Sequence, residues 1–136
     1  MCLAVYLATE STVPPIEWNK ESPAFYLEAV EEGQPVCKQF SLPHVYYAGS
    51  HEGCGCGFSK DGEVGPELEL CQANYRSLGH TIRAALAQGS KVEVFTCWEG
   101  DQGDKPECIE SITPTELEAP NFELKELQFL HVTHDA

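Results

Sequence analysis

Positive charge is scarce in this chain of 136 residues: Lys and Arg total 8, Asp and Glu total 22, and the formal net charge is −14. Such a charge repels nucleic-acid phosphates and anionic lipid headgroups, so we expect no nucleic-acid partner and no membrane partner. No apolar run approaches the ~18 residues of a membrane span. The first residues, Met1–Glu10, lack the basic start and the cleavage site of a signal peptide. These absences predict a soluble, acidic protein of the cytoplasm.

The sequence also lacks the short motifs that identify common enzyme classes. It has no Gly-rich phosphate loop with a Lys, no Gly-x-Ser-x-Gly elbow and no dinucleotide-binding fingerprint. Its seven cysteines are an odd number without a secretory signal, which argues against a complete disulfide framework. The sequence therefore leaves open the substrate and whether the protein is an enzyme.

Length and hydrophobic pattern predict one α+β domain over residues 1–136, since domains commonly have about 100–200 residues. Residues 66–88 carry apolar side chains at spacings of three and four, with Pro66 in the first turn and Gly89 at the cap, which predicts one long helix. Apolar runs and two-residue alternation predict strands at 2–8, 23–30, 36–40, 45–48, 91–98 and 122–132. We therefore expect a mostly antiparallel sheet of about six strands with the helix packed on one face.

Four local features refine this expectation. A turn at 31–35 predicts that segments 23–30 and 36–40 form a hairpin. The parity of apolar residues slips at 125–126, which predicts a bulge in the last strand. Gly79 lies inside the helix at a cost of about 1 kcal/mol relative to Ala, and a close crossing over a strand explains it. A capping-box pattern at Thr113–Glu116 predicts a short second helix.

The segment Gly-Ser-His-Glu-Gly-Cys-Gly-Cys-Gly-Phe, residues 49–58, carries the strongest chemical signal. Positions two apart in an extended chain share a face, so Cys54 and Cys56 present their sulfurs side by side and can chelate one soft metal ion. His51 can fold back to offer a nitrogen, and the intervening glycines let the backbone approach closely. We expect a zinc or iron site formed by His51, Cys54 and Cys56. Cys97 is the favoured additional ligand, because this loop can meet the end of its strand.

Two other interpretations of the same loop stay open. Cys54 and Cys56 can cycle between dithiol and disulfide, with one thiol attacking and the other resolving. Alternatively, the cysteines are packed as small apolar residues in a metal-free binding or scaffolding module. Such a module would bind a protein partner, or form a homodimer, through a sheet edge or an aromatic surface. Tyr46, Tyr47 and Trp98 are candidates to line a pocket near the loop.

The string Cys54-Gly55-Cys56-Gly57-Phe58 resembles the C-G-C-G tail of A-type iron–sulfur carrier proteins. In that family, an earlier cysteine joins the two tail cysteines to hold a cluster. The likeness covers five residues, in the middle of this chain, and implies that such a dithiol can hold iron or sulfur chemistry.

Cys2 would become an N-terminal nucleophile if Met1 were removed. The apolar run that follows Cys2 instead favours the start of a buried strand.

Overall fold

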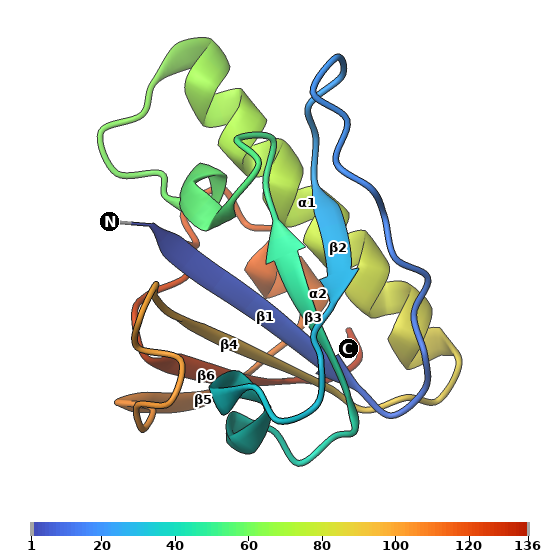
Figure 1. The fold of residues 1–136 in the computed structure, drawn as a ribbon. Helices are drawn as coiled ribbons and strands as arrows, with labels where there is room; N and C mark the ends of the chain where they lie inside the picture. The colour runs from blue at the N-terminus through green and yellow to red at the C-terminus, as the bar shows by residue number, and fades with distance from the viewer. Residues whose placement is uncertain (1, 136) are drawn as a thin grey trace.

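The computed structural model of the chain describes residues 2–135, and it has the α+β architecture expected from the sequence. Six strands form one mixed sheet in the order β2-β3-β1-β4-β6-β5 (Figure 1). Neighbouring strands are antiparallel, except that β5 and β6 are parallel. The strands are β1 (Leu3–Thr9), β2 (Tyr26–Ala29), β3 (His44–Gly49), β4 (Val92–Trp98), β5 (Cys108–Ile112) and β6 (Gln128–Val132).

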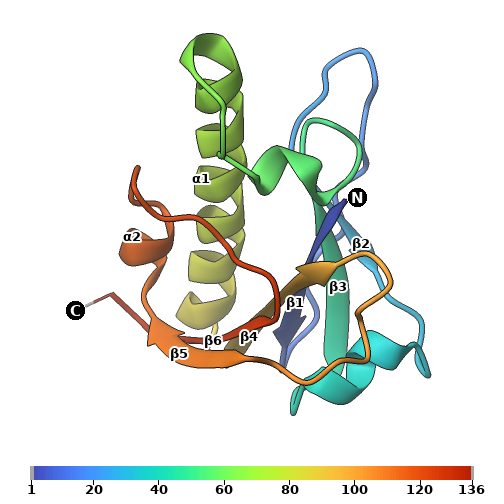
Figure 2. The same ribbon diagram turned by 90° about the vertical axis from the view of Figure 1, so that its left-hand side faces the viewer.

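The helices lie on two sides of the sheet. The long helix α1 (Gly65–Ala87) and the short helix α2 (Pro114–Leu117) lie on one side, and the 3-10 turn η1 (Pro35–Gln39) lies on the other (Figure 2). α1 has Pro66 in its first turn and ends before Gly89, whose φ of +84° suits glycine. The predicted capping box of α2 is present, since Thr113 and Glu116 exchange side-chain to backbone hydrogen bonds.

Alternation along β1 divides the core into two clusters, one on each face of the sheet. Leu3, Val5 and Leu7 face α1 and pack in the larger cluster with residues such as Tyr75 and Ile82. The intervening residues of β1 face the other way, into a smaller cluster with Val36, Val45, Phe95, Cys97 and Phe129. Both faces of β1 are therefore covered, which accounts for its continuous apolar sequence.

Four predictions about local structure were wrong. Residues 36–40 do not form a hairpin strand, because Pro35 starts the 3-10 turn η1 instead. Residues 108–112, for which no strand was expected, form the edge strand β5. The last strand is shorter than expected: it begins only after Leu127, whose φ of +52° turns the chain where a bulge was predicted. The close neighbour of Gly79 is the side chain of Glu118, after α2, and not a strand.

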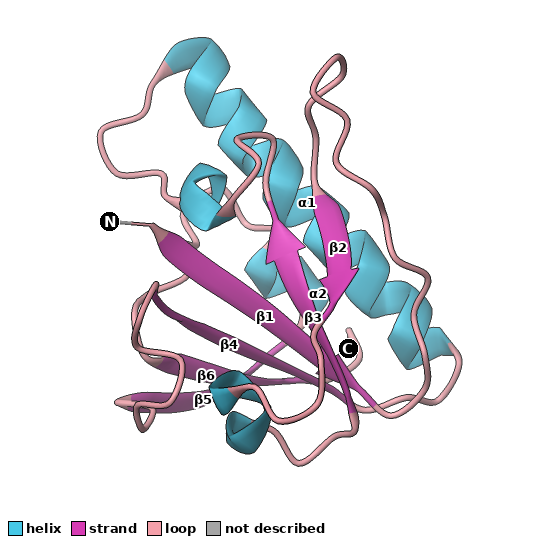
Figure 3. Ribbon diagram, viewed as in Figure 1, coloured by secondary structure: helices cyan, strands magenta, loops and turns pink. Residues whose placement is uncertain are grey.

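Residues 50–64, which connect β3 to α1, include a second 3-10 turn, η2 (Gly55–Phe58), and this connection is coiled apart from that turn (Figure 3). Phe58 anchors η2 in the larger core cluster, where its ring makes an edge-to-face contact with Tyr75 at a centroid distance of 5.3 Å. The Tyr75 hydroxyl donates to the Phe58 carbonyl oxygen at 2.5 Å. Within residues 2–135, no helix combines the length and the apolar composition that crossing a bilayer requires.

Candidate metal centre

The antiparallel pairing of β1 with β3 sets the position of the Gly-rich loop. Val5 pairs with Ala48, so the end of β3 lies beside the start of β1, and the loop that follows β3 passes over that start. Gly55 approaches the carbonyl group of Leu3 so closely that a Cβ atom would overlap its oxygen. The glycine therefore permits a contact between η2 and β1 that no side chain would allow.

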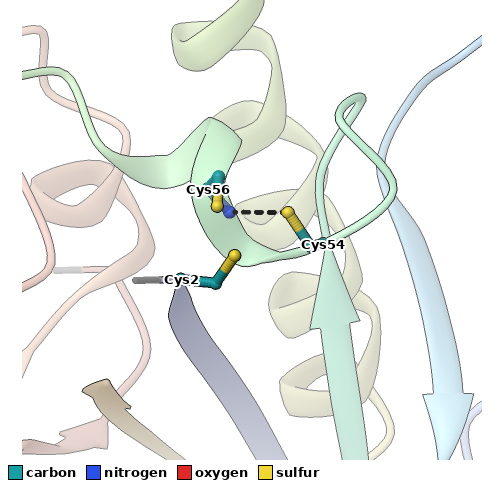
Figure 4. A group of neighbouring side chains, drawn as sticks. All are labelled: Cys2, Cys54 and Cys56. Atoms are coloured by element: carbon teal, nitrogen blue, oxygen red, sulfur yellow. Dashed lines mark hydrogen bonds between the residues drawn. The ribbon is translucent and has the colours of Figure 1, made fainter. Parts of the chain in front are cut away.

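Three cysteines meet at this contact. Cys2 immediately precedes β1, and Cys54 and Cys56 flank Gly55 in the loop (Figure 4). Their three sulfur atoms lie within 4.8 Å of one another, close enough to share one metal ion. The backbone N–H of Cys56 donates to the Cys54 sulfur at 3.4 Å, which helps to fix the position of that sulfur. The structure thus brings together Cys54 and Cys56, as predicted, and adds Cys2.

The thiol of Cys56 is poorly ionised without a metal. Burial, followed by hydrogen bonds with Cys2 and Cys54, raises its pKa to about 12. Near neutral pH this group is therefore a neutral thiol, and a metal ion that binds it must displace its proton. Because thiolate is the attacking species in disulfide exchange, the raised pKa disfavours Cys56 as the nucleophile of a dithiol oxidoreductase.

Ser50 holds the loop in the conformation that presents the cysteines. This buried residue donates to the Cys54 carbonyl oxygen from its backbone N–H at 2.8 Å and from its hydroxyl at 2.6 Å. The same hydroxyl oxygen accepts from the backbone N–H of Gly57 at 2.9 Å. One side chain thus ties both ends of the Cys-x-Cys turn, which limits the conformations of the two sulfurs.

His51, predicted as a ligand beside the two loop cysteines, does not belong to the three-thiol group. The buried Asn74 accepts from the His51 backbone N–H at 3.2 Å and donates to the Gly57 carbonyl oxygen at 3.1 Å. These backbone contacts fix the orientation of the Asn74 amide, so its Nδ2 donates to His51 Nδ1, 2.8 Å away. The imidazole hydrogen is then on Nε2, which is buried and has no hydrogen-bond partner within residues 2–135.

The imidazole of His51 lies in a second group, with the carboxylates of Glu52 and Glu67. One ligand atom from each residue lies within 4.8 Å of the others, which is also close enough for a metal ion. However, ligation through Nε2 requires hydrogen on Nδ1, where Asn74 is already a donor. Both glutamates are exposed. The three-thiol group is therefore the better metal site.

Cys97, predicted as the additional ligand, packs in the smaller core cluster and is absent from the thiol group. It pairs with Ala4 across β1 and β4 and shares its face with Phe95, so its side chain points into the core. Burial, with a smaller effect of nearby carboxylates such as that of Glu99, raises its pKa to about 12. Strand alternation therefore places the Cys97 sulfur in the core, where it packs against apolar side chains. The other cysteines, Cys37, Cys71 and Cys108, are free and also lie outside the group.

Cys2 is the residue that sequence reasoning did not assign to the site. The apolar sequence after it predicted a buried position, but its exposure is intermediate, because it precedes the first paired residue of β1. Its link to the loop depends on which strand lies next to β1, and nothing local in the sequence specifies that neighbour. Knowledge that β1 pairs with β3 would have identified Cys2 as a member of the site.

Comparisons of the chain with protein-family models, with curated proteins and with solved structures find no match.

Proposed function

We propose that this chain is a metal-binding protein in which the thiolates of Cys2, Cys54 and Cys56 hold one zinc or iron ion. The observation that carries the proposal is the convergence of three sulfurs, from two distant segments of the sequence, within 4.8 Å. Zn–S bonds of ~2.3 Å in a tetrahedral site place sulfurs about 3.8 Å apart, so small movements of these side chains are sufficient. Thiolate sulfur is also a ligand of iron in iron–sulfur centres.

The site supplies three protein ligands and leaves one coordination position for another group. Among residues 2–135, no further His, Cys, Asp or Glu ligand atom lies within 4.8 Å of all three sulfurs. Structural zinc sites usually have four protein ligands, whereas catalytic sites have three and an exchangeable water or substrate. An open fourth position therefore favours a role in which the bound metal contacts a small molecule, rather than a purely structural role.

Metal analysis of the purified protein tests this proposal. We expect the chain, prepared with reductant and without chelator, to contain one zinc or iron ion. Cys54→Ser and Cys56→Ser should each lower the metal content severalfold, because a serine hydroxyl is a much poorer ligand for these ions than a thiolate. Cys2→Ser should have the same effect, because its thiolate is the third ligand of the proposed site. The measurement is the molar ratio of metal to protein by plasma mass spectrometry.

Cys108→Ser and Cys37→Ser are matched controls, since both remove a partly exposed thiol outside the site. They should retain the metal content of the unmodified chain. Equal metal loss in the control variants, or a chain that binds neither zinc nor iron when reconstituted, would contradict the proposal. In the second case the cysteines are packing residues of a binding module, or a dithiol pair if thiol titration shows reversible oxidation of two of them.

A further inference from the structure

We propose that a cavity on the sheet face opposite α1 binds an organic cation, a protonated amine or guanidinium on a short aliphatic chain. The cavity has a volume of about 560 Å³, within the range of small-molecule sites. Its floor follows from strand register: Glu28 pairs with Tyr47 and Tyr47 pairs with Tyr6, so the three side chains stand in a row on one face.

Two other segments complete the walls of the cavity. Pro35 and Val36 of η1 form an apolar side, and Glu99 and Gln102 of the loop after β4 form a polar one. The Gln39 side chain of η1 donates to the Gln102 carbonyl oxygen at 2.9 Å and so ties the two walls together. The cavity is therefore built by four separate stretches of the chain, at residues 6, 28–36, 47 and 99–102, rather than by a single loop.

The chemistry of the lining selects for a cation. Its ionisable side chains other than the tyrosines are the carboxylates of Glu28, Glu31 and Glu99, and none of its lining residues is basic. Within residues 2–135, these three glutamates form no ion pair with a Lys, Arg or His. The net charge of −14 also raises the local concentration of cations at the surface.

The two tyrosines supply the second, independent reason for a cation. The rings of Tyr6 and Tyr47 make an edge-to-face contact at 5.5 Å, and aromatic surfaces attract cations. Tyr6 is only 7% exposed, and its hydroxyl oxygen accepts from Gln102 at 3.2 Å. The apolar wall at Val36 suits the methylene groups of such a ligand.

The cavity lies close to the thiol group without sharing its ligands. The Tyr26 ring lies 6.1 Å from that of Tyr47, and the Tyr26 hydroxyl donates to the Gly53 carbonyl oxygen, next to Cys54. On the other side, the backbone N–H of Glu99 donates to the Cys2 carbonyl oxygen at 2.8 Å. The cavity is formed by the protein alone, so binding of the cation does not require the metal.

Titration calorimetry with agmatine, which carries an amine and a guanidinium on a four-carbon chain, tests this inference. We expect saturable binding of agmatine and no binding of the dianion glutarate. Glu28→Gln and Glu99→Gln should each weaken agmatine binding about tenfold, as expected for loss of a charged hydrogen-bond partner. Both glutamates are exposed, so these variants should fold normally.

Glu32→Gln is the matched control, because it removes the same charge from an exposed position outside the cavity lining. It should leave the affinity nearly unchanged. An agmatine titration that does not saturate, or an equal loss of affinity in Glu28→Gln and Glu32→Gln, would overturn the inference. Cys54→Ser should retain agmatine binding while it loses metal, so failure of this inference can be distinguished from failure of the metal site.

Discussion

Gly55→Ala is expected to lower both the stability and the metal content of the protein. The added Cβ would overlap the Leu3 carbonyl oxygen, which belongs to the backbone of β1 and cannot move aside without disturbing the centre of the sheet. The turn η2 must therefore move away from β1. Forcing an extra carbon into a packed position commonly costs 1–3 kcal/mol, and we expect about 2–3 kcal/mol here, measured as the free energy of unfolding in urea.

The same displacement should separate the ligands of the proposed site. Cys54 and Cys56 move with η2, whereas Cys2 stays with β1, so the three sulfurs can no longer share one ion. Gly103→Ala is the control, since its Cβ would lie 3.7 Å from the nearest atom, in ordinary contact with Pro35. We expect that control to change neither stability nor metal content. A Gly55→Ala variant with the stability and metal content of the unmodified chain would contradict a close packing of η2 on β1 at Gly55.

Removal of the metal is expected to lower the free energy of unfolding by about 4 kcal/mol. A ligand that binds only the folded state stabilises it by this amount when its free concentration is about a thousand times its dissociation constant. The site should provide such linkage, because Cys2 is far in sequence from Cys54 and Cys56, and the three sulfurs meet only after β1 and β3 pair. For a chain of this size the loss corresponds to a fall in melting temperature of about 10–20 °C.

Calorimetric melting with and without a strong chelator measures this effect. The double variant Cys54→Ser/Cys56→Ser should melt at one temperature in both conditions, near that of the chelated protein. The control double variant Cys37→Ser/Cys108→Ser should keep the full difference, since neither thiol is in the group. A melting temperature of the unmodified chain that does not respond to the chelator is the outcome that argues against a linked metal site.

Local sequence patterns identified most elements of the fold. The apolar stripe over 66–88 and the strict alternation over 91–98 specify α1 and β4 within one or two residues. The errors lie where tertiary contacts decide the conformation. Residues 36–40 have a strand-like composition, but Pro35 begins a 3-10 turn there, and Phe40 packs on Phe95 and Phe129. The edge strand β5 is short and largely exposed, so no apolar pattern marks it.

For a similar reason, the sequence identified only two of the three cysteines in the candidate site. Cys54 and Cys56 lie two positions apart in the chain, and the glycines around them indicate a close approach of the backbone, which Gly55 makes to Leu3. The third cysteine depends on the order of strands in the sheet, which short-range patterns do not define. His51 was expected to join the sulfurs because of its spacing, but the buried Asn74 binds both its backbone and its ring.

X-ray absorption at the edge of the bound metal tests most directly whether three cysteines hold it. For zinc we expect three sulfur neighbours at ~2.3 Å, with one lighter atom from solvent or a small molecule. Cys2 is the ligand whose place in the site depends on the fold. In the Cys2→Ser variant, we expect the metal to have two sulfur neighbours instead of three. A metal surrounded only by nitrogen and oxygen, or a sulfur shell that is unchanged in Cys2→Ser, would contradict the assignment of Cys2, Cys54 and Cys56 as the metal centre.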